Sequence, residues 1–157
     1  MMRAPDRDNA GVIAHPPLLW LAAVLIGFGI EALWPVALPG QAARIAVGFA
    51  LFAAAFAVFL WAWQTFRRAG TNVQTQKPST TVVSDGPYRF TRNPIYLAMA
   101  AGTVAIGIGA GSLWVVAMAV PLVVVLHHGV IRREERYLEA KFGDAYRAYR
   151  ARVRRWV

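Results

Sequence analysis

Four long apolar runs constrain what this chain can fold into more than any other feature. They extend over residues 17–34, 42–66, 95–110 and 113–131. A helix needs about 20 mostly apolar residues to cross a bilayer, with a range of about 17–25. The first, second and fourth runs meet this length, whereas the third is short and rich in glycine. With 57% hydrophobic residues, the chain is too apolar for an ordinary soluble domain. We predict an all-α, integral-membrane helical bundle with about four transmembrane helices and a C-terminal amphipathic helix.

Positive charges are distributed asymmetrically along the chain. Lys and Arg occur between the second and third runs and after the fourth, and Arg3 and Arg7 precede the first. The connections 35–41 and 111–112 contain none. Basic residues beside transmembrane helices favour the cytoplasmic side, so we expect both termini in the cytoplasm. The membrane that we expect is a bacterial inner membrane. The net charge of +9 then indicates contact with the lipid bilayer rather than with nucleic acid, for which no binding module is visible.

The organisation that follows is one membrane domain over residues 1–157. Two N-terminal spans occupy residues 1–66, and a cytosolic loop occupies residues 67–94. A helical hairpin follows over residues 95–131, and a cytosolic tail over residues 132–157. Nothing in the pattern specifies an oligomeric state.

A polar, basic and aromatic segment leads directly into the third apolar run. It reads Gly86-Pro87-Tyr88-Arg89-Phe90-Thr91-Arg92-Asn93-Pro94-Ile95-Tyr96. Pro94 suits the first turn of a helix, where its missing N–H is not needed. Thr91 and Asn93 are both candidates for the residue that caps this helix. An arginine pair flanked by prolines at a membrane edge indicates a site rather than an inert anchor.

The tail combines a charged cluster with a regular apolar stripe. The cluster extends over residues 132–136 and includes Glu134 and Glu135. The stripe recurs at helical spacing and consists of Leu138, Phe142, Tyr146, Tyr149, Val153 and Trp156. Gly143 is expected to interrupt the helix. Two interpretations remain open: an interfacial helix lying on anionic lipid, or a helix that folds back as a lid over a cofactor.

These two segments resemble the motifs of the isoprenylcysteine carboxyl methyltransferase and phospholipid methyltransferase superfamily. Gly86-Pro87-Tyr88-Arg89 and Arg92-Asn93-Pro94-Ile95-Tyr96 are similar to its GPYR–RHPxYxG motif. The tail is similar to its second motif, and the resemblance covers about residues 72–153. Members of the superfamily are helical integral-membrane proteins that depend on S-adenosylmethionine, so the resemblance implies this cofactor and a lipophilic or lipid acceptor.

Two residues depart from the motif. Asn93 stands where the eukaryotic motif has His, and Ala98 stands where it has Gly. Asn retains a hydrogen-bonding amide but cannot act as a base near neutral pH. Its role is therefore expected to be cofactor positioning rather than proton transfer.

The resemblance also assigns a set of candidate site residues. The cofactor-binding candidates are Tyr88, Arg92, Asn93, Pro94, Tyr96, Glu134, Glu135 and Tyr146, and the catalytic candidates are Arg92 and Glu135. Arg92 is a planar fork suited to the carboxylate of S-adenosylmethionine, and either glutamate suits its ammonium or ribose hydroxyls. Three other residues stay open: His127 and His128 as a base or as headgroup contacts, and Glu31 as a functional carboxylate or an interface residue. Two adjacent histidines without further ligands do not predict a metal site.

The function expected from these features is S-adenosylmethionine-dependent methyl transfer at the cytosolic membrane face. An isoprenylcysteine-type carboxylate or a similar lipophilic group is the expected acceptor, which favours a carboxyl O-methyltransferase. The identity of the acceptor stays open, and a small lipophilic metabolite is a further possibility. The alternatives are a phospholipid N-methyltransferase of the phosphatidylethanolamine type and a non-catalytic membrane transport or assembly protein with the same fold.

Overall fold

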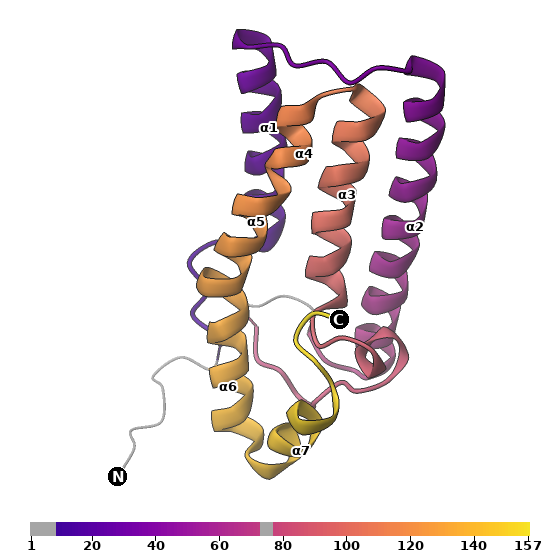
Figure 1. Cartoon of the computed structure of the whole chain (residues 1–157). Coiled ribbons are helices and arrows are strands. Elements are labelled where there is room, and N and C mark those ends of the chain that lie inside the picture. Colours follow the sequence, from indigo (N-terminus) through magenta and orange to yellow (C-terminus); the bar gives the residue numbers. More distant parts are fainter. Residues whose placement is uncertain (1–8, 73–76) are drawn as a thin grey trace.

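The chain folds into a bundle of four helical columns, seen side by side in Figure 1. A computed structural model describes residues 9–72 and 77–157, so the predicted topology charges Arg3 and Arg7 lie outside the described residues. Three columns are the single helices α1 (Pro16–Leu33), α2 (Gln41–Arg68) and α3 (Pro94–Ala110). The fourth is continuous and consists of α4 (Leu113–Ala117), α5 (Ala119–Leu126), the π-helix η2 (His127–Ile131) and α6 (Arg132–Phe142). The predicted all-α fold class is confirmed.

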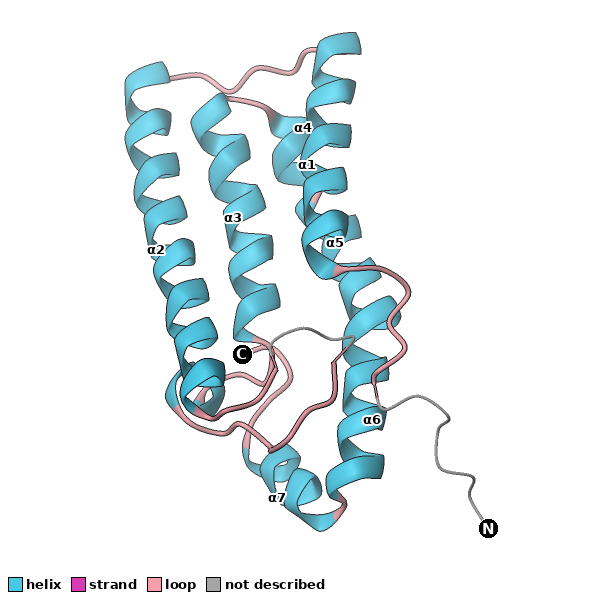
Figure 2. Ribbon diagram, turned by 180° about the vertical axis from the view of Figure 1, so that it is seen from behind, coloured by secondary structure: helices cyan, strands magenta, loops and turns pink. Residues whose placement is uncertain are grey.

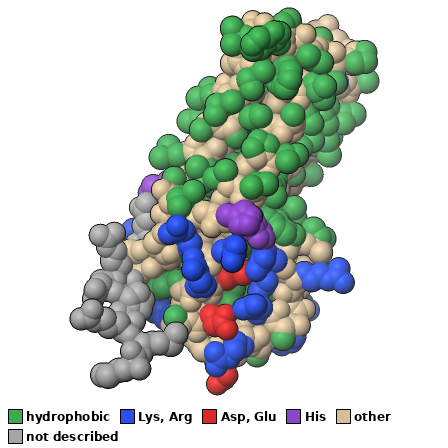
Figure 3. Space-filling view, turned by 60° about the vertical axis from the view of Figure 1, so that its left-hand side comes forward, with side chains coloured by type: hydrophobic (Ala, Val, Ile, Leu, Met, Phe, Trp, Pro, Cys, Tyr) green, Lys and Arg blue, Asp and Glu red, His purple; other side chains and the backbone are tan. Residues whose placement is uncertain are grey.

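Three of these columns are long and apolar enough to cross a membrane. They are α1, α2 and the continuous helix Leu113–Phe142, whereas α3 has 17 residues. At 1.5 Å per residue, α3 spans only about 25 Å, against a hydrocarbon core of about 30 Å. The chain is thus an integral-membrane protein, and the number of crossings stays a prediction. Figure 3 shows apolar side chains over the upper part of the molecule and charged ones gathered at its lower end.

Prolines and glycines set the ends of the short helix α3. Pro94 occupies its first turn, as predicted, and Gly111 ends it in the left-handed conformation with φ 76°. The next helix is capped by Ser112, whose hydroxyl accepts from the Val115 amide. The predicted side-chain cap on α3 is wrong: Asn93 holds the cap position, but its amide instead donates to the Arg155 carbonyl. The Asn93 side chain thus bonds a distant carbonyl instead of accepting from the backbone N–H groups of its own helix.

Small residues let the columns approach closely. A Cβ added to Gly48 on α2 would lie 2.6 Å from the Gly109 backbone on α3. A Cβ on Gly27 of α1 would lie 2.8 Å from the backbone of Val115. Such contacts are typical of helices packed in membranes, where close approach of backbones supplies much of the attraction. The glycines of the third apolar run therefore serve packing at Gly107 and Gly109, but not at Gly102, beside which space is open.

The fourth column extends beyond its apolar part. The sequence predicts a span that ends at Ile131, but the helix continues through the charged cluster to Phe142. At 30 residues it is about 45 Å long, so its charged end projects past the bundle. Gly143, with φ 52°, breaks the helix as predicted. Helix α7 (Asp144–Arg152) then turns back beneath α2 and α3 (Figures 1 and 2).

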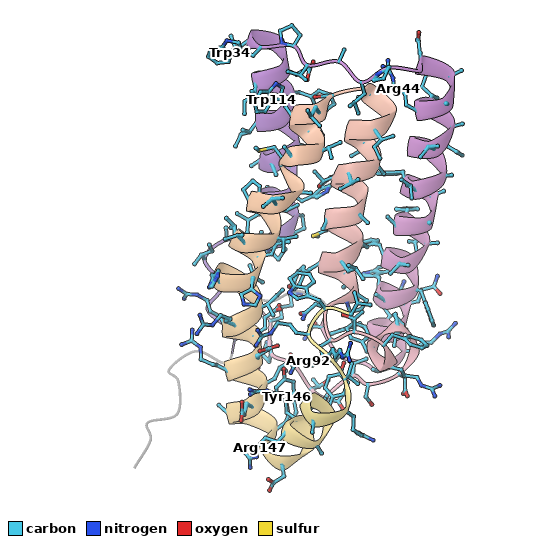
Figure 4. The ribbon with its side chains drawn as sticks, in the orientation of Figure 1. Trp34, Arg44, Arg92, Trp114, Tyr146 and Arg147 are labelled. Atoms are coloured by element: carbon cyan, nitrogen blue, oxygen red, sulfur yellow. The ribbon has the colours of Figure 1, made fainter. Side chains whose placement is uncertain are left out.

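Glu31 lies at the opposite end of the bundle, which we call the far end. Its carboxylate accepts from the Val36 amide at 2.9 Å and from the Ser112 hydroxyl at 2.7 Å. Nearby, the Trp114 indole donates to the Trp34 carbonyl at 2.7 Å (Figure 4). Glu31 thus ties the α1–α2 connection to the start of the fourth column. Its contacts support a structural role, remote from the predicted site.

Candidate functional site

A small polar cavity lies at the lower end of the bundle, where α2 ends and α3 begins. Its volume is about 100 Å³. Seven of the predicted site residues line it: Tyr88, Arg92, Asn93, Tyr96, Glu134, Glu135 and Tyr146. Pro94 is not in its wall, but is buried at the start of α3 beside it. Figure 4 places Arg92 and Tyr146 below the lower end of α3. We call this cavity the polar pocket.

An ion pair joins the two sequence motifs inside the polar pocket. Arg92 Nη2 lies 3.1 Å from Glu135 Oε1, and the side chains are only 8% and 9% exposed. The residues meet because the fourth column returns the chain to the membrane face from which α3 starts. The predicted convergence of Arg92 with the glutamate pair is thus present for Glu135.

Arg92 retains unused hydrogen-bonding capacity. Its Nε and Nη1 atoms are buried, and neither has a partner among the residues that the structure describes. A buried guanidinium donor without an acceptor costs free energy, about 1–3 kcal/mol or more for a charged group. Since Arg92 lines the polar pocket, these donors are available to an anionic ligand.

Glu134 follows the fourth apolar run and also lines the polar pocket. Its Oε1 accepts from the Tyr96 hydroxyl at 2.7 Å. Burial raises the pKa of Glu134 to about 7, and the neighbouring Glu135 charge raises it too, while the Tyr96 bond opposes the shift. This carboxyl therefore titrates close to neutral pH, unlike an ordinary glutamate.

Helix α7 closes the pocket from below with its aromatic face. Tyr146 and Tyr149 are 2% and 5% exposed and pack in one cluster with Ala62, Val83 and Tyr88. The Tyr149 hydroxyl donates to the Tyr88 carbonyl at 2.9 Å. Burial raises the pKa of Tyr146 to about 12, so its hydroxyl is neutral at physiological pH. Of the two interpretations of the tail, the contacts favour folding back over the pocket, since the stripe packs on protein.

The last residues form a strap across the start of α3. We call residues 153–157 the C-terminal strap. The Arg92 amide donates to the Arg154 carbonyl at 3.0 Å. The Arg155 carbonyl accepts from the Thr91 hydroxyl at 3.1 Å and from the Asn93 amide at 2.9 Å. The strap is therefore bonded to three consecutive residues of the first motif.

Arg155 is a site residue that the sequence analysis missed. Its Nε and Nη2 atoms donate to the two oxygens of Glu135 at 2.9 and 2.7 Å. Glu135 thus holds two arginines at once, Arg92 and Arg155. One more arginine in a basic tail carries no periodic signal. The only hint was its position within the last step of the apolar stripe, between Val153 and Trp156.

Of the two histidines, His127 contacts the strap and His128 contacts Arg132 on α6. His127 Nε2 lies 3.4 Å from Arg155 Nη1, and its ring stacks on Trp156 with centroids 6.5 Å apart. His128 Nδ1 lies 3.5 Å from Arg132 Nη1. Neither histidine is among the described residues that line the pocket. The position of His127 supports a role in seating the strap.

Comparison with known proteins agrees with the motif resemblance. A family model described as phospholipid methyltransferase matches residues 43–145, which include most of α2, the first motif, α3 and α6. An uncharacterized protein of Haemophilus influenzae is 54% identical over 35 residues, which cover 22% of this chain and 56% of that protein. No solved structure matches the chain. Because the family model covers more than half of the sequence, the chain belongs to the phospholipid methyltransferase family.

Proposed function

We propose that this chain is an S-adenosylmethionine-dependent methyltransferase that acts at the cytosolic membrane face on a lipophilic acceptor. The family supports a membrane methyltransferase of the phospholipid or isoprenylcysteine type. Within that range we favour an isoprenylcysteine-type carboxylate as acceptor. The proposal rests on the polar pocket and on the residues that its two motifs contribute.

The observation that carries the proposal is the buried, half-paired guanidinium of Arg92. Its Nη2 is paired with Glu135, while its Nε and Nη1 lack partners in the described part of the chain. A free arginine edge beside a carboxylate complements a ligand that bears both a carboxylate and an ammonium. The amino-acid portion of S-adenosylmethionine has both groups, so the residues present fit this cofactor.

The remaining residues of the pocket suit positioning and the exclusion of water. Tyr88, Tyr96 and Tyr146 present aromatic surface suited to an adenine ring or a sulfonium. When bound, S-adenosylmethionine supplies an electrophilic methyl group. The protein then has to align an acceptor with that group and keep water out, which is work that fixed side chains and a cover can do.

Cofactor binding is expected to require movement of the strap. The polar pocket holds about 100 Å³, whereas pockets for ligands of drug size hold about 300–1,000 Å³. Arg155 donates to both carboxylate oxygens of Glu135, the residue that we propose binds the ammonium of the cofactor. Release of Arg155 would free the carboxylate and enlarge the pocket in a single motion.

The preference for a carboxylate acceptor follows from proton chemistry. A carboxylate is already a nucleophile at neutral pH, whereas a lipid ammonium must first lose a proton. Asn93 cannot take that proton, and its amide is already bonded to the strap. The first motif therefore offers positioning without a base, which supports O-methylation.

Titration of the purified full-length protein with S-adenosylmethionine tests the proposal. Arg92→Gln removes the charged fork and should weaken binding by about 1–3 kcal/mol. Arg89→Gln is the matched control, because Arg89 lies three residues away and is exposed. Equal binding by both folded variants would show that Arg92 does not hold the cofactor.

A second measurement separates the acceptors. Labelled methyl donor is incubated with the protein and, in turn, an S-prenylated cysteine, phosphatidylethanolamine and small lipophilic carboxylates. We expect label in the prenylated cysteine. Label in phosphatidylethanolamine alone would show that the proposed acceptor is wrong but that the protein is a methyltransferase. Absence of both cofactor binding and transfer would favour a non-catalytic protein.

A further inference from the structure

A row of basic side chains lies outside the polar pocket, at the end of the fourth apolar run. Arg132 Nη1 lies 3.5 Å from His128 Nδ1, and the His128 ring meets that of His127 edge-on with centroids 4.8 Å apart. His127 Nε2 in turn lies 3.4 Å from Arg155 Nη1. None of these residues is among the described residues that line the polar pocket. We call the four residues the basic cluster.

The basic cluster offers donors and excess positive charge. Arginine has donors only, so each neutral histidine accepts through the ring nitrogen that faces its arginine. The proton of His127 is thereby assigned to Nδ1 and that of His128 to Nε2, and both N–H groups are donors. Within the described part of the chain, the acidic partner of the cluster is Glu135, which already pairs with Arg92. Such a set complements an anion, and arginine forks suit phosphate in particular.

The position of the cluster suits a phosphate at the membrane surface. The fourth apolar run ends at Ile131, so His128 and Arg132 lie on either side of its last residues, and both are exposed. Figure 3 shows histidine side chains between the apolar surface and the Lys and Arg side chains. Lipid phosphates lie just outside the hydrocarbon core, at this boundary. His127 and His128 also begin the π-helix η2, a rare element that is frequent at functional sites.

Arg155 connects the basic cluster with the polar pocket. Its Nη1 faces His127, while its Nε and Nη2 donate to Glu135. The Arg155 side chain is 32% exposed, so an anion at the membrane surface can reach it. An anion beside His127 therefore competes with Glu135 for the same guanidinium.

We propose that the basic cluster binds the phosphate of an anionic lipid headgroup and that this binding draws Arg155 away from Glu135. The lipid is an effector rather than the methyl acceptor, because its phosphate lies outside the polar pocket. The phosphate site does not depend on methyl transfer, whereas its effect on the cofactor rests on the proposed function. By linkage, the cofactor strengthens lipid binding by the same factor by which the lipid strengthens cofactor binding.

Competition for lipid binding to the full-length protein in detergent tests the phosphate site. A fluorescent phosphatidylglycerol analogue is bound first, and unlabelled phosphatidylglycerol, phosphatidylcholine and inorganic phosphate are compared as competitors. Phosphatidylglycerol, with its net negative charge, should compete about tenfold better than zwitterionic phosphatidylcholine. Equal competition by the two lipids would overturn the proposal. Competition by inorganic phosphate alone would show that the ligand is a soluble anion and would overturn the assignment to lipid.

Two charge variants on α6 locate the site. Arg132→Gln removes one arginine of the cluster and should weaken phosphatidylglycerol binding about fivefold or more. Arg136→Gln is the matched control, because Arg136 is also exposed, lies one turn further from the apolar run and donates to the Arg132 carbonyl. Equal affinities of these two variants would overturn the assignment to the cluster. If Arg132→Gln fails to fold, His128→Gln takes its place and should show the same selective loss.

Cofactor binding in nanodiscs tests the effect on Arg155. Addition of phosphatidylglycerol to phosphatidylcholine nanodiscs should tighten S-adenosylmethionine binding by the wild-type protein about fivefold or more. Arg155→Gln removes the guanidinium from Glu135, so this variant should bind the cofactor tightly in both kinds of nanodisc. A wild-type affinity that is the same in both would overturn the coupling.

The two measurements keep this proposal separable from the proposed function. Selective lipid binding that Arg132→Gln weakens, without S-adenosylmethionine binding, would retain the phosphate site and reject the proposed function. Cofactor binding without selective lipid binding would reject the phosphate site and leave the proposed function in place.

Discussion

At the scale of single residues, the chemistry of the polar pocket centres on Glu135. This one carboxylate pairs with Arg92 from the first motif and with Arg155 from the C-terminal strap. Glu135 and Arg92 are both more than nine-tenths buried. Breaking such a pair leaves a buried charge without compensation, which costs far more than the loss of an exposed pair. Glu135 therefore serves the fold as well as the proposed site.

Replacing Glu135 tests whether the buried ion pair contributes more to stability than an exposed ion pair does. Glu135→Gln is expected to destabilise the protein by about 3–5 kcal/mol, because Arg92 stays buried and charged. Glu139→Gln is the control: its pair with Arg150 is 33% and 48% exposed, and the expected loss is below about 1 kcal/mol. Unfolding of the two variants in detergent gives the comparison. Similar losses would mean that Arg92 is solvated in solution.

Glu134 is expected to make stability depend on pH. Its folded pKa of about 7 lies above the usual value of 4.5, so the folded state binds the proton more tightly than the unfolded state. The resulting stability is full below about pH 4.5 and is lost as the pH rises toward 7. In Glu134→Gln this loss disappears, while the amide oxygen can still accept from Tyr96. The melting temperature of the variant relative to wild type should therefore be higher at pH 8 than at pH 5. The same difference at both pH values would place Glu134 in solvent.

At the scale of elements, the tail is two helices and a strap rather than one amphipathic helix. Helix α6 continues the fourth column, and the positive φ at Gly143 reverses the chain so that α7 returns under α3. The strap then joins Arg92, Thr91 and Asn93 to the C-terminus. The cover over the polar pocket thus depends on a single turn at Gly143.

Removing residues 153–157 tests the strap as part of the site. From the sequence alone, these residues look like the end of an interfacial helix that lies on the membrane, and their loss is expected to leave cofactor binding intact. Their bonds to Glu135 and to the start of α3 change that expectation. We now expect the truncated protein to bind S-adenosylmethionine about tenfold more tightly, because Arg155 no longer occupies Glu135 and the strap no longer has to move. Deletion of Val157 alone, which is 79% exposed, is the control. Unchanged binding by the longer truncation would show that these residues only contact the membrane surface and are not part of the site.

At the scale of the whole molecule, charged and apolar side chains lie at different positions along the length of the bundle. Apolar side chains cover the upper part, and the motifs and the charged tail share the lower end (Figure 3). The polar pocket lies near this boundary, where α2 ends and α3 begins. Such an arrangement suits a reaction between a soluble cofactor and an acceptor that stays in the membrane.

The predicted topology follows from the same division. With four crossings and both termini in the cytoplasm, a reporter fused after Gly40 and one fused after Val157 should lie on opposite sides of the membrane. Reporter activity or protease access in cells measures this. A fusion after Ala69 should match the one after Val157. Reporters on the same side after Gly40 and Val157 would rule out the four-span model.

The sequence by itself determined the features that depend on neighbouring residues. Apolar run length predicted the membrane helices, and Pro94 and Gly143 marked where helices start and stop. The order of the two motifs predicted the family and the meeting of Arg92 with Glu135. Each of these signals is local, or follows from one hairpin that brings the chain back to the same face.

Tertiary structure decided which partner each group has. Asn93 bonds the strap instead of capping its helix, and Arg155, 20 residues beyond Glu135, completes that site. Gly102 faces open space, although in sequence it resembles Gly107, which packs tightly. Periodicity tells which face of a helix is apolar but not what covers it. The cover depends on how far α6 projects and where α7 turns, and only the assembled bundle sets those positions.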